Sequence, residues 1–530
     1  MADTENEEID EVGLKNAVER CKERGILIPT LEQLRHPELI PEKVKEELKT
    51  IGLWDTNSRN LFRITWKNEP VEKGGLYGPV NAMELPPSLT GVKSKIFVLL
   101  GKFFPTGCHK VGASFGPLVD RLTRGKFDPT KQKALWPSTG NYCRGGAFNS
   151  ALLGCKAVAI LPAGMSQERF KWLESIGSEI IATPGCESNV KEIFDKVNEL
   201  TTTKGDEVVA LNQFCEFMNP LWHYNVTGPA MEEVWQTRGK GTRLSGVFLT
   251  QGSAGTLASA EYLKKHYPAV KLGVGEAKQC PTLLENGFGD HRIEGIGDKH
   301  VPWIHNLKNT DLVASIDDEQ CMHLVQLFQT EVGKKVLAKH GVPKETLDQL
   351  KNLGISGIAN IIGAIKLCKY FEFNENDSVF TVATDSFEMY RSRLDEMEKE
   401  HGEYTETRAE CDWFRYLDGI STDWMQECTH VDRRRMHHLK YYTWVEQQGK
   451  TCEELNAQWK CDKYWEKKWT ANIALDERIR KFNEMTGLAE AYPAPKCCCC
   501  CKKEAECEKS CCCKKEGECE KACCSSCPSK

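Results

Sequence analysis

Lys110 closes the segment PTGCHK at residues 105–110. The apolar run before it, at residues 95–100, is typical of a buried strand, and residues 111–119 after it are typical of the start of a helix. A lysine at a strand-to-helix turn, after proline and glycine, is held on a rigid corner. If its ammonium is partly desolvated, its pKa falls and the amine can form a Schiff base with a carbonyl. Taken alone, the segment favours an ordinary surface lysine, because short motifs recur by chance.

A glycine-rich stretch, GSAGT at residues 252–256, is the second candidate site. It follows an apolar run at residues 246–250 and precedes a helix-like run at residues 257–263. Backbone N–H groups at such a helix start can cradle a phosphate, and the hydroxyls of Ser253 and Thr256 add donors. A P-loop would end in Gly-Lys-Ser/Thr, which is absent here. A glycine-rich turn without a ligand is the alternative, and by itself it is the better one.

Two further stretches complete an ordered set of motifs. STGN at residues 138–141 follows the run LWP, and GISG at residues 354–357 precedes a helix-like run. In this order the motifs resemble those of the cysteine synthase and cystathionine β-synthase family, the fold-type II pyridoxal-phosphate enzymes. The resemblance covers about residues 85–394 and includes residues 161–166, 176–181, 212–214, 219–224 and 294–297. Each piece is weak, but their joint order is specific.

The resemblance implies an α/β fold with two lobes, in which parallel sheets are wrapped by helices and pyridoxal 5′-phosphate binds between the lobes. The alternation of strand-like and helix-like runs also indicates a parallel sheet. Residues 157–161 are fully apolar, as in a strand buried on both faces. Residues 169–176 have the pattern of an amphipathic helix, and residues 179–182 that of the next strand.

The same resemblance implies a role for each motif residue. Lys110 is the expected catalytic residue, which binds the cofactor as a Schiff base and then moves the α-proton of the substrate. The expected cofactor-binding residues are Lys110, Asn141 at the ring oxygen, Gly252, Ser253, Ala254, Gly255 and Thr256 at the phosphate, and Ser356 at the pyridine nitrogen. Ala254 replaces a glycine that is usual in the family. The substrate carboxylate is expected at Ser138, Thr139 and Gln213, although Ser138 and Thr139 also suit a simple helix N-cap.

Ser356 bears on the type of reaction. A neutral hydroxyl at the pyridine nitrogen does not stabilise a protonated ring as an aspartate would, which favours β-elimination over transamination. Departures from the family pattern at Cys108, Tyr142 and the pair Cys143-Arg144 leave the identity of the substrate open.

The expected function is therefore pyridoxal-phosphate-dependent β-elimination or β-replacement on cysteine or a related β-substituted amino acid. The enzyme would be a lyase or a cysteine synthase-like transferase in sulfur metabolism. Loss of a thiol would yield sulfide, pyruvate and ammonia, whereas entry of a thiol would yield cysteine or cystathionine. A serine or threonine dehydratase uses the same machinery and is one alternative. A metal- or sulfur-binding protein that acts through its C-terminal tail is another.

The C-terminal tail contains thirteen of the 26 cysteines and a repeat, at residues 499–510 and 511–522. With so little apolar surface to bury, this segment is expected to be disordered without a ligand. Dense thiolates suit soft metal ions such as Zn(II), Cu(I) or Cd(II), as in metallothioneins, which the tail resembles. A sulfane-sulfur store or a redox buffer is the alternative. The expected metal ligands are Cys497, Cys498, Cys499, Cys500, Cys501, Cys507, Cys511, Cys512, Cys513, Cys519, Cys523, Cys524 and Cys527.

Composition excludes several classes of protein. The net charge of −6 gives no electrostatic case for nucleic acid binding. No apolar run approaches the ~18 residues that would indicate a membrane span. The first eight residues are acidic and polar, unlike a secretory or mitochondrial signal. Because the cysteines outside the tail are also scattered singly, a cytoplasmic location is expected.

The chain divides into four expected segments: an N-terminal helical segment at 1–84, the cofactor-binding core at 85–400, a Trp-rich helical extension at 401–490, and the tail at 491–530. Aromatic anchors that fasten the extension to the core are favoured over a substrate lid or a partner surface. Haem-binding members of the family that this chain resembles carry a Cys/His pair in their N-terminal segment. Here no histidine precedes Arg35 and the only early cysteine is Cys21, so haem is not expected. A small-molecule amino-acid substrate and a homodimer are expectations from the family alone.

Overall fold

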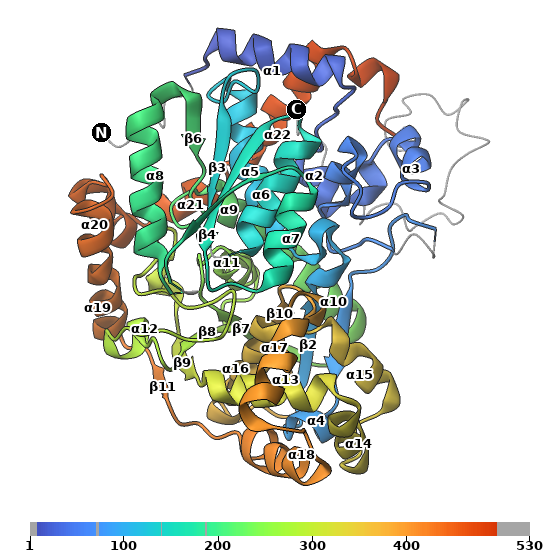
Figure 1. Cartoon of the computed structure of the whole chain (residues 1–530), viewed down its shortest axis with the longest axis vertical. Coiled ribbons are helices and arrows are strands. Elements are labelled where there is room, and N and C mark those ends of the chain that lie inside the picture. Colours follow the sequence, from blue (N-terminus) through green and yellow to red (C-terminus); the bar gives the residue numbers. More distant parts are fainter. Residues whose placement is uncertain (1–7, 70–73, 139, 186–187, 496–530) are drawn as a thin grey trace.

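The chain folds into two lobes, each built on a sheet (Figure 1). The computed structural model describes residues 8–69, 74–138, 140–185 and 188–495. The small lobe holds a 4-stranded sheet in the order β5-β4-β3-β6, and the large lobe holds a 7-stranded sheet in the order β1-β2-β10-β7-β8-β9-β11. The two-lobed α/β architecture expected from the sequence is thus confirmed.

The small sheet is parallel throughout. Its strands are β3 (Lys133–Pro137), β4 (Lys156–Pro162), β5 (Glu179–Thr183) and β6 (Val208–Ala210). Parallel neighbours need long crossovers, usually helices. The helices around this sheet are α5 (Lys110–Thr123), α6 (Asn141–Leu152), α7 (Gln167–Ser175) and α8 (Val190–Lys204). The predicted strands at 157–161 and 179–182 and the predicted helix at 169–176 correspond to β4, β5 and α7.

The large sheet has a parallel centre and antiparallel edges. Its strands are β1 (Ala82–Leu85), β2 (Lys95–Leu100), β7 (Arg243–Thr250), β8 (Lys271–Ala277), β9 (Leu312–Ile316), β10 (Asp377–Ala383) and β11 (Met425–Glu427). Every residue of β10 is buried, as in a central parallel strand covered on both faces. The edge strands β1 and β11 were not predicted, because three or four residues are too few to show a period.

The remaining helices of the core cover the large sheet and the junction between the lobes. They are α4 (Pro87–Thr90), α9 (Met218–Trp222), α10 (Gly228–Arg238), α11 (Leu257–His266), α12 (Thr282–Glu285), α13 (Asp318–Gln329), α14 (Glu331–Lys339), α15 (Lys344–Gln349), α16 (Ile355–Tyr370) and α17 (Arg391–His401). Helix α16 is buried from Ile355 to Cys368 and packs on β7 and β10. It therefore forms the centre of the apolar core of the large lobe.

The N-terminal segment and the C-terminal extension meet each other. The first contains α1 (Glu11–Glu23), α2 (Leu31–Arg35) and α3 (Glu42–Leu48), and the second contains α18 (Glu406–Asp412), α19 (His430–Lys440), α20 (Cys452–Lys460), α21 (Lys463–Trp469) and α22 (Asn472–Thr486). The extension runs from the foot of the large lobe along one side to α1 at the top (Figure 1). Asp476 of α22 accepts hydrogen bonds from the backbone N–H groups of Leu31 (2.6 Å) and Glu32 (3.1 Å).

Aromatic side chains fasten the extension to the core. The buried Trp444 donates its indole N–H to the carbonyl of Val301 at 2.8 Å, and the buried Trp469 donates to the carboxylate of Glu261 at 2.9 Å. These contacts fit a clamp better than a substrate lid. The extension also supplies β11, which pairs with β9, so it is not purely helical as predicted.

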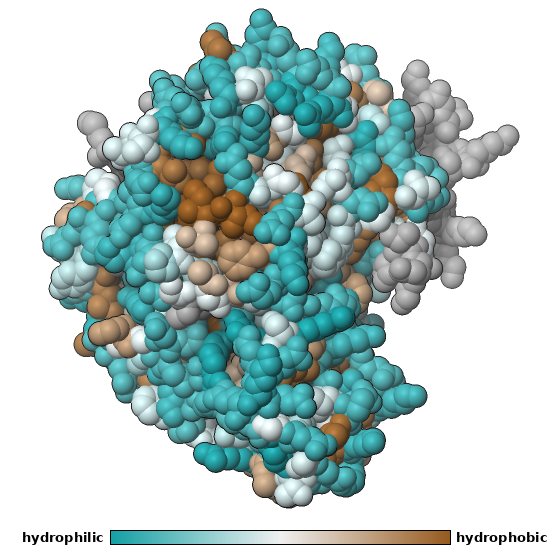
Figure 2. Space-filling model, in the orientation of Figure 1, coloured by the Kyte–Doolittle hydropathy of each residue, from teal (hydrophilic) through white to brown (hydrophobic). Residues whose placement is uncertain are grey.

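The face shown in Figure 2 is mostly hydrophilic, with an apolar area over the strands of the small sheet. Among the described residues, no helix is both long and apolar enough to cross a membrane.

Candidate active site

The amine of Lys110 connects the two sheets. Lys110 begins α5, and its Nζ donates to the side-chain oxygen of Gln213 at 3.1 Å and to the hydroxyl of Ser253 at 3.0 Å. Gln213 follows the last strand of the small sheet, whereas Ser253 follows β7 of the large sheet. Because parallel strands end at the same edge of a sheet, this is where open α/β folds place ligands.

The GSAGT loop has the geometry of a phosphate cradle. It lies between β7 and the ten-residue helix α11, and none of its backbone N–H groups has a hydrogen-bond acceptor among the described residues. A Cβ on Gly255 would lie 2.3 Å from the amide oxygen of Asn219, so only glycine fits there. Ala254 has φ +66°, a left-handed conformation that costs energy in a residue other than glycine. Unpaired N–H groups at a helix start attract an anion.

Ser356 is a buried hydroxyl without a partner. It lies at the start of α16, it is fully buried, and its Oγ has no hydrogen-bond partner among the described residues. A Cβ on Gly295 would lie 3.5 Å from this oxygen, so the glycine keeps the space beside it open. A buried polar atom without a partner costs about 1–3 kcal/mol, and an aromatic ring nitrogen would satisfy it.

Asn141 is held by a buried carboxylate that the sequence analysis missed. Its side-chain NH2 donates to Asp385 at 2.6 Å, and its oxygen accepts from Arg144 at 3.3 Å. Asp385 also accepts from the hydroxyl of Tyr390 at 2.5 Å. Burial raises the pKa of the Asp385 carboxyl above its usual range. Asp385 follows the apolar strand β10, and a carboxylate at a strand end was the one signal that could have found it.

Ser138 and Gln213, which were predicted to bind the substrate carboxylate, lie side by side. The amide NH2 of Gln213 donates to the Ser138 hydroxyl at 3.2 Å, and the backbone N–H of Gly140 donates to the same oxygen at 3.1 Å. The residues that line this cavity include Lys110, Ser138, Asn141, Tyr142, Gln213, Phe214, Ser253 and Asp298. Phe214 and Asp298 were not predicted as site residues: Phe214 lies in the matched stretch 212–214 but was given no role, and Asp298 lies just after the matched stretch 294–297. Thr139 lies outside the described residues.

A buried ionic group joins the lobes behind the cavity. The guanidinium of Arg169, on α7 of the small lobe, lies 3.3 Å from the carboxylate of Glu294, which also pairs with Arg393 at 2.7 Å. Arg169 donates to the hydroxyl of Tyr390 at 2.9 Å as well. The relative position of the lobes is therefore set partly by charge pairs that water does not screen.

The residues present fit pyridoxal phosphate. The loop at 252–256 offers a phosphate N–H groups that have no acceptor in the described part of the chain, Ser356 offers a hydroxyl to a ring nitrogen, and Lys110 offers the amine between them. No group of three or more potential metal ligands occurs among the described residues. The tail cysteines named above, Cys497 to Cys527, lie outside the described part of the chain.

Comparisons with known proteins identify relatives of this chain. The sequence matches the family described as "Pyridoxal-phosphate dependent enzyme" over residues 75–334. It is 30% identical to a cysteine synthase of Staphylococcus aureus (strain Mu50) over 298 residues. This aligned region covers 56% of this chain and 87% of that protein. It is 24% identical over 324 residues to the cystathionine beta-synthase of Saccharomyces cerevisiae, covering 60% of this chain and 61% of that protein.

Solved structures support the fold. A hydrogen sulfide-producing enzyme from Fusobacterium nucleatum superimposes with a TM-score of 0.51 at 22% identity, over 66% of this chain and 93% of that one. An O-acetyl serine sulfhydrylase from Entamoeba histolytica gives 0.51 at 21% identity, over 62% and 92%. The chain belongs to the pyridoxal-phosphate dependent enzyme family. It is a pyridoxal-phosphate-dependent enzyme with the two-lobed fold of its relatives.

Proposed function

We propose that this enzyme carries out β-elimination or β-replacement on cysteine or a related β-substituted amino acid. The observation that carries the proposal is the position of the Lys110 amine, between Ser253 of the phosphate loop and Gln213 of the substrate cavity. The names of the relatives, cysteine synthase and cystathionine beta-synthase, place such chemistry in sulfur amino-acid metabolism. Sulfide would then be either a product or a co-substrate.

Lys110 is the proposed base for the α-proton. Pyridoxal phosphate, when bound, supplies the carbonyl that captures the amino acid and the conjugated ring that withdraws electrons from its α-carbon. With the amino acid bound, the amine of Lys110 would lie near the α-carbon and would take the proton from that carbon. Ser253 and Gln213 limit where the amine can move, because both lie within hydrogen-bond distance of it.

Ser138 and Gln213 are the proposed carboxylate ligands. Gln213 contacts both Lys110 and Ser138, so it couples the position of the base to the position of the carboxylate. Both side chains lie near the N-terminus of α6, where the helix dipole favours an anion. Thr139 is proposed as a third ligand from its place in the motif.

The remaining motif residues would hold the ring. Asn141, oriented by Asp385 and Arg144, has a second N–H to offer the ring oxygen. Ser356 would bond the pyridine nitrogen without protonating it, so β-elimination is favoured over transamination. Asp298 adds a carboxylate to the cavity wall. Because this carboxylate would repel a negative charge, the cavity suits a neutral β-substituent better than an anionic one.

Product analysis tests the proposal. The purified holoenzyme is incubated with cysteine alone, with O-acetylserine and sulfide, and with serine or threonine. Sulfide release from cysteine marks a desulfhydrase, and sulfide consumption marks a synthase. Keto-acid release from serine or threonine without sulfide chemistry would instead mark a dehydratase and refute the assignment to sulfur amino-acid metabolism. Lys110→Ala should abolish turnover, whereas Lys191→Ala, which removes one member of the exposed pair Lys191–Asp195, should not.

A second function is proposed for the tail, because half of the cysteines lie in it. We propose that Cys497 to Cys527 bind Zn(II), Cu(I) or Cd(II). Deleting residues 497–530 should then remove the bound metal, measured by atomic emission after desalting, and leave turnover unchanged. Metal content that survives the deletion would contradict this role.

We also propose a homodimer in a reducing compartment such as the cytoplasm. The described cysteines form no disulfide with one another, which agrees with reduced thiols. Light scattering on the purified protein tests the dimer, and fractionation of the source cells tests the compartment.

A further inference from the structure

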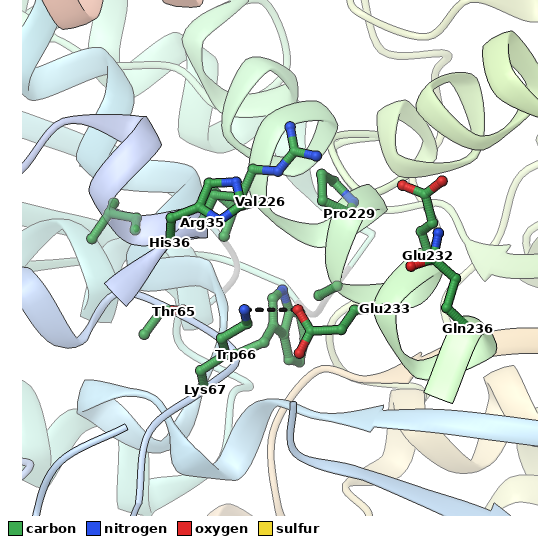
Figure 3. A pocket seen from close by; sticks show the side chains of 12 residues that line it. Arg35, His36, Thr65, Trp66, Lys67, Val226, Pro229, Glu232, Glu233 and Gln236 are labelled. Atoms are coloured by element: carbon green, nitrogen blue, oxygen red, sulfur yellow. Dashed lines mark ion pairs between the residues drawn. The ribbon is translucent and has the colours of Figure 1, made fainter. Parts of the chain in front are cut away.

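A cavity of about 170 Å³ lies between the N-terminal segment and α10 (Figure 3). Arg35, Trp66 and Lys67 form one side, and Ala230, Glu232 and Glu233 of α10 form the other. At about 30 Å³ for each water molecule, the cavity has room for five or six waters, or for one small solute of similar bulk. It contains none of the proposed active-site residues.

Side chains of both charges face this cavity. Lys67 and Glu233 pair across it at 2.7 Å, as the dashed line in Figure 3 shows. Arg35 donates to the hydroxyl of Tyr262 at 3.2 Å, which uses one of the five N–H donors of a guanidinium. Glu232 is held in place, because its carboxylate accepts a hydrogen bond from Tyr262 at 2.6 Å.

This arrangement complements a zwitterion. A bound carboxylate would gain charge-assisted hydrogen bonds from Arg35 and Lys67, and a bound ammonium would gain them from Glu233, in place of the ion pair that Lys67 and Glu233 form with each other. A simple anion or a simple cation would leave one wall unmatched, and an uncompensated charge in a confined site is costly. Trp66 and Ala230 leave an apolar surface for a short side chain.

Part of the cavity lies outside the family match. The family match begins at residue 75, whereas Arg35, Trp66 and Lys67 precede it. One wall therefore belongs to the shared core, and the other belongs to a segment outside that match.

The floor of the cavity leads to the catalytic lysine. Trp66 donates its indole N–H to Thr227 at 3.0 Å, and its ring centroid lies 5.7 Å from that of His109, which precedes Lys110. His109 is fully buried, and burial lowers its pKa to about 3, so it stays neutral and packs as an aromatic ring. A shift of Trp66 would thus reach the start of α5 through two packed rings.

We propose that this cavity binds a free, small α-amino acid, and that Trp66 and His109 transmit its occupancy to Lys110. The site is distinct from the substrate cavity, and binding there does not depend on which reaction the enzyme performs.

Calorimetric titration of the holoenzyme tests the binding. The probes are L-alanine, propionate, which lacks the ammonium, and ethylamine, which lacks the carboxylate. Alanine that enters the active site changes the visible absorption of the cofactor. Heat of binding that is released without such a change therefore comes from alanine bound in the cavity between the N-terminal segment and α10. Alanine should bind there at least tenfold more tightly than either analogue; equal binding of propionate would overturn the zwitterion assignment.

Variants locate the bound alanine. Lys67→Met removes a charge and Ala230→Leu fills the space, and each should weaken the cavity phase at least tenfold. Lys334→Met, which removes one member of the surface pair Lys334–Glu331, is the matched control and should change nothing. Binding heat without an absorption change that persists in both test variants would overturn the proposal. If one of the two variants fails to fold, the other still tests it.

The coupling is tested by the rate at which hydroxylamine removes the cofactor from Lys110, which needs no sulfide assay. Alanine should change this rate at least twofold in the native enzyme. The change should disappear in Lys67→Met and in Trp66→Phe, which keeps a ring but loses the hydrogen bond to Thr227. An unchanged response in these variants would overturn the coupling.

Discussion

Replacing Ser356 by alanine should change the apoprotein and the holoenzyme in opposite directions. In the apoprotein, the buried Oγ has no partner among the described residues, so its removal relieves a desolvation penalty of about 1–3 kcal/mol. In the holoenzyme, the same change removes one hydrogen bond to the cofactor, worth about 0.5–1.5 kcal/mol. Cofactor affinity depends on the difference between the two forms, so the two changes add up to about 1.5–4.5 kcal/mol. Since about 1.4 kcal/mol is a factor of ten, cofactor affinity should fall at least tenfold.

Two measurements check this. Denaturant unfolding of the apoprotein should show a higher free energy of unfolding for Ser356→Ala than for the native chain, and titration of the apoprotein with pyridoxal phosphate should show weaker binding. Ser150→Ala is the matched control: Ser150 is also buried, but its hydroxyl accepts from the indole of Trp136 at 3.0 Å. The control should lose stability in both forms and keep its cofactor affinity.

The reasoning fails if the Ser356→Ala apoprotein is less stable than the native apoprotein by as much as the control. That result would mean that the hydroxyl has a bond within the protein and does not wait for a ligand.

Three other predictions concern buried carboxylates. Burial raises the pKa of Glu261 to about 7, so between about pH 5 and 7 the folded state keeps a proton that the unfolded state releases. The free energy of unfolding should therefore fall by about 1.4 kcal/mol per pH unit as the pH rises through this range. Glu261→Gln should flatten this slope in denaturant titrations at several pH values. Asp476→Ala should leave the N–H groups of Leu31 and Glu32 without acceptors and lower the free energy of unfolding by about 2–4 kcal/mol. The N-terminal segment should then be proteolysed faster. Proteolysis at the native rate would contradict the role of α22 in holding this segment. Asp385→Asn should weaken the hold on Asn141 and lower kcat about tenfold with a smaller change in KM, checked by initial rates, and an unchanged kcat would contradict its positioning role.

Local patterns in the sequence were enough to locate the strands and helices around the candidate site. The apolar run before Lys110 is β2, the run before the GSAGT loop is the end of β7, and the helices after both begin where turn residues end the strands. These features depend on neighbouring residues, through strand period, turn preference and helix starts, so they can be read without knowing the fold. The resemblance to a known family then supplied the roles.

Contacts between distant residues could not be read in this way. Asp385 meets Asn141 across 244 positions of sequence, and Trp66 meets Thr227 across 161. The short strand β11 and the closure of α22 on the N-terminal segment are equally invisible to periodicity. Such contacts depend on the order of strands in the sheets and on how helices pack over them. Packing adds up many weak interactions over the whole chain, and no single stretch of sequence contains them.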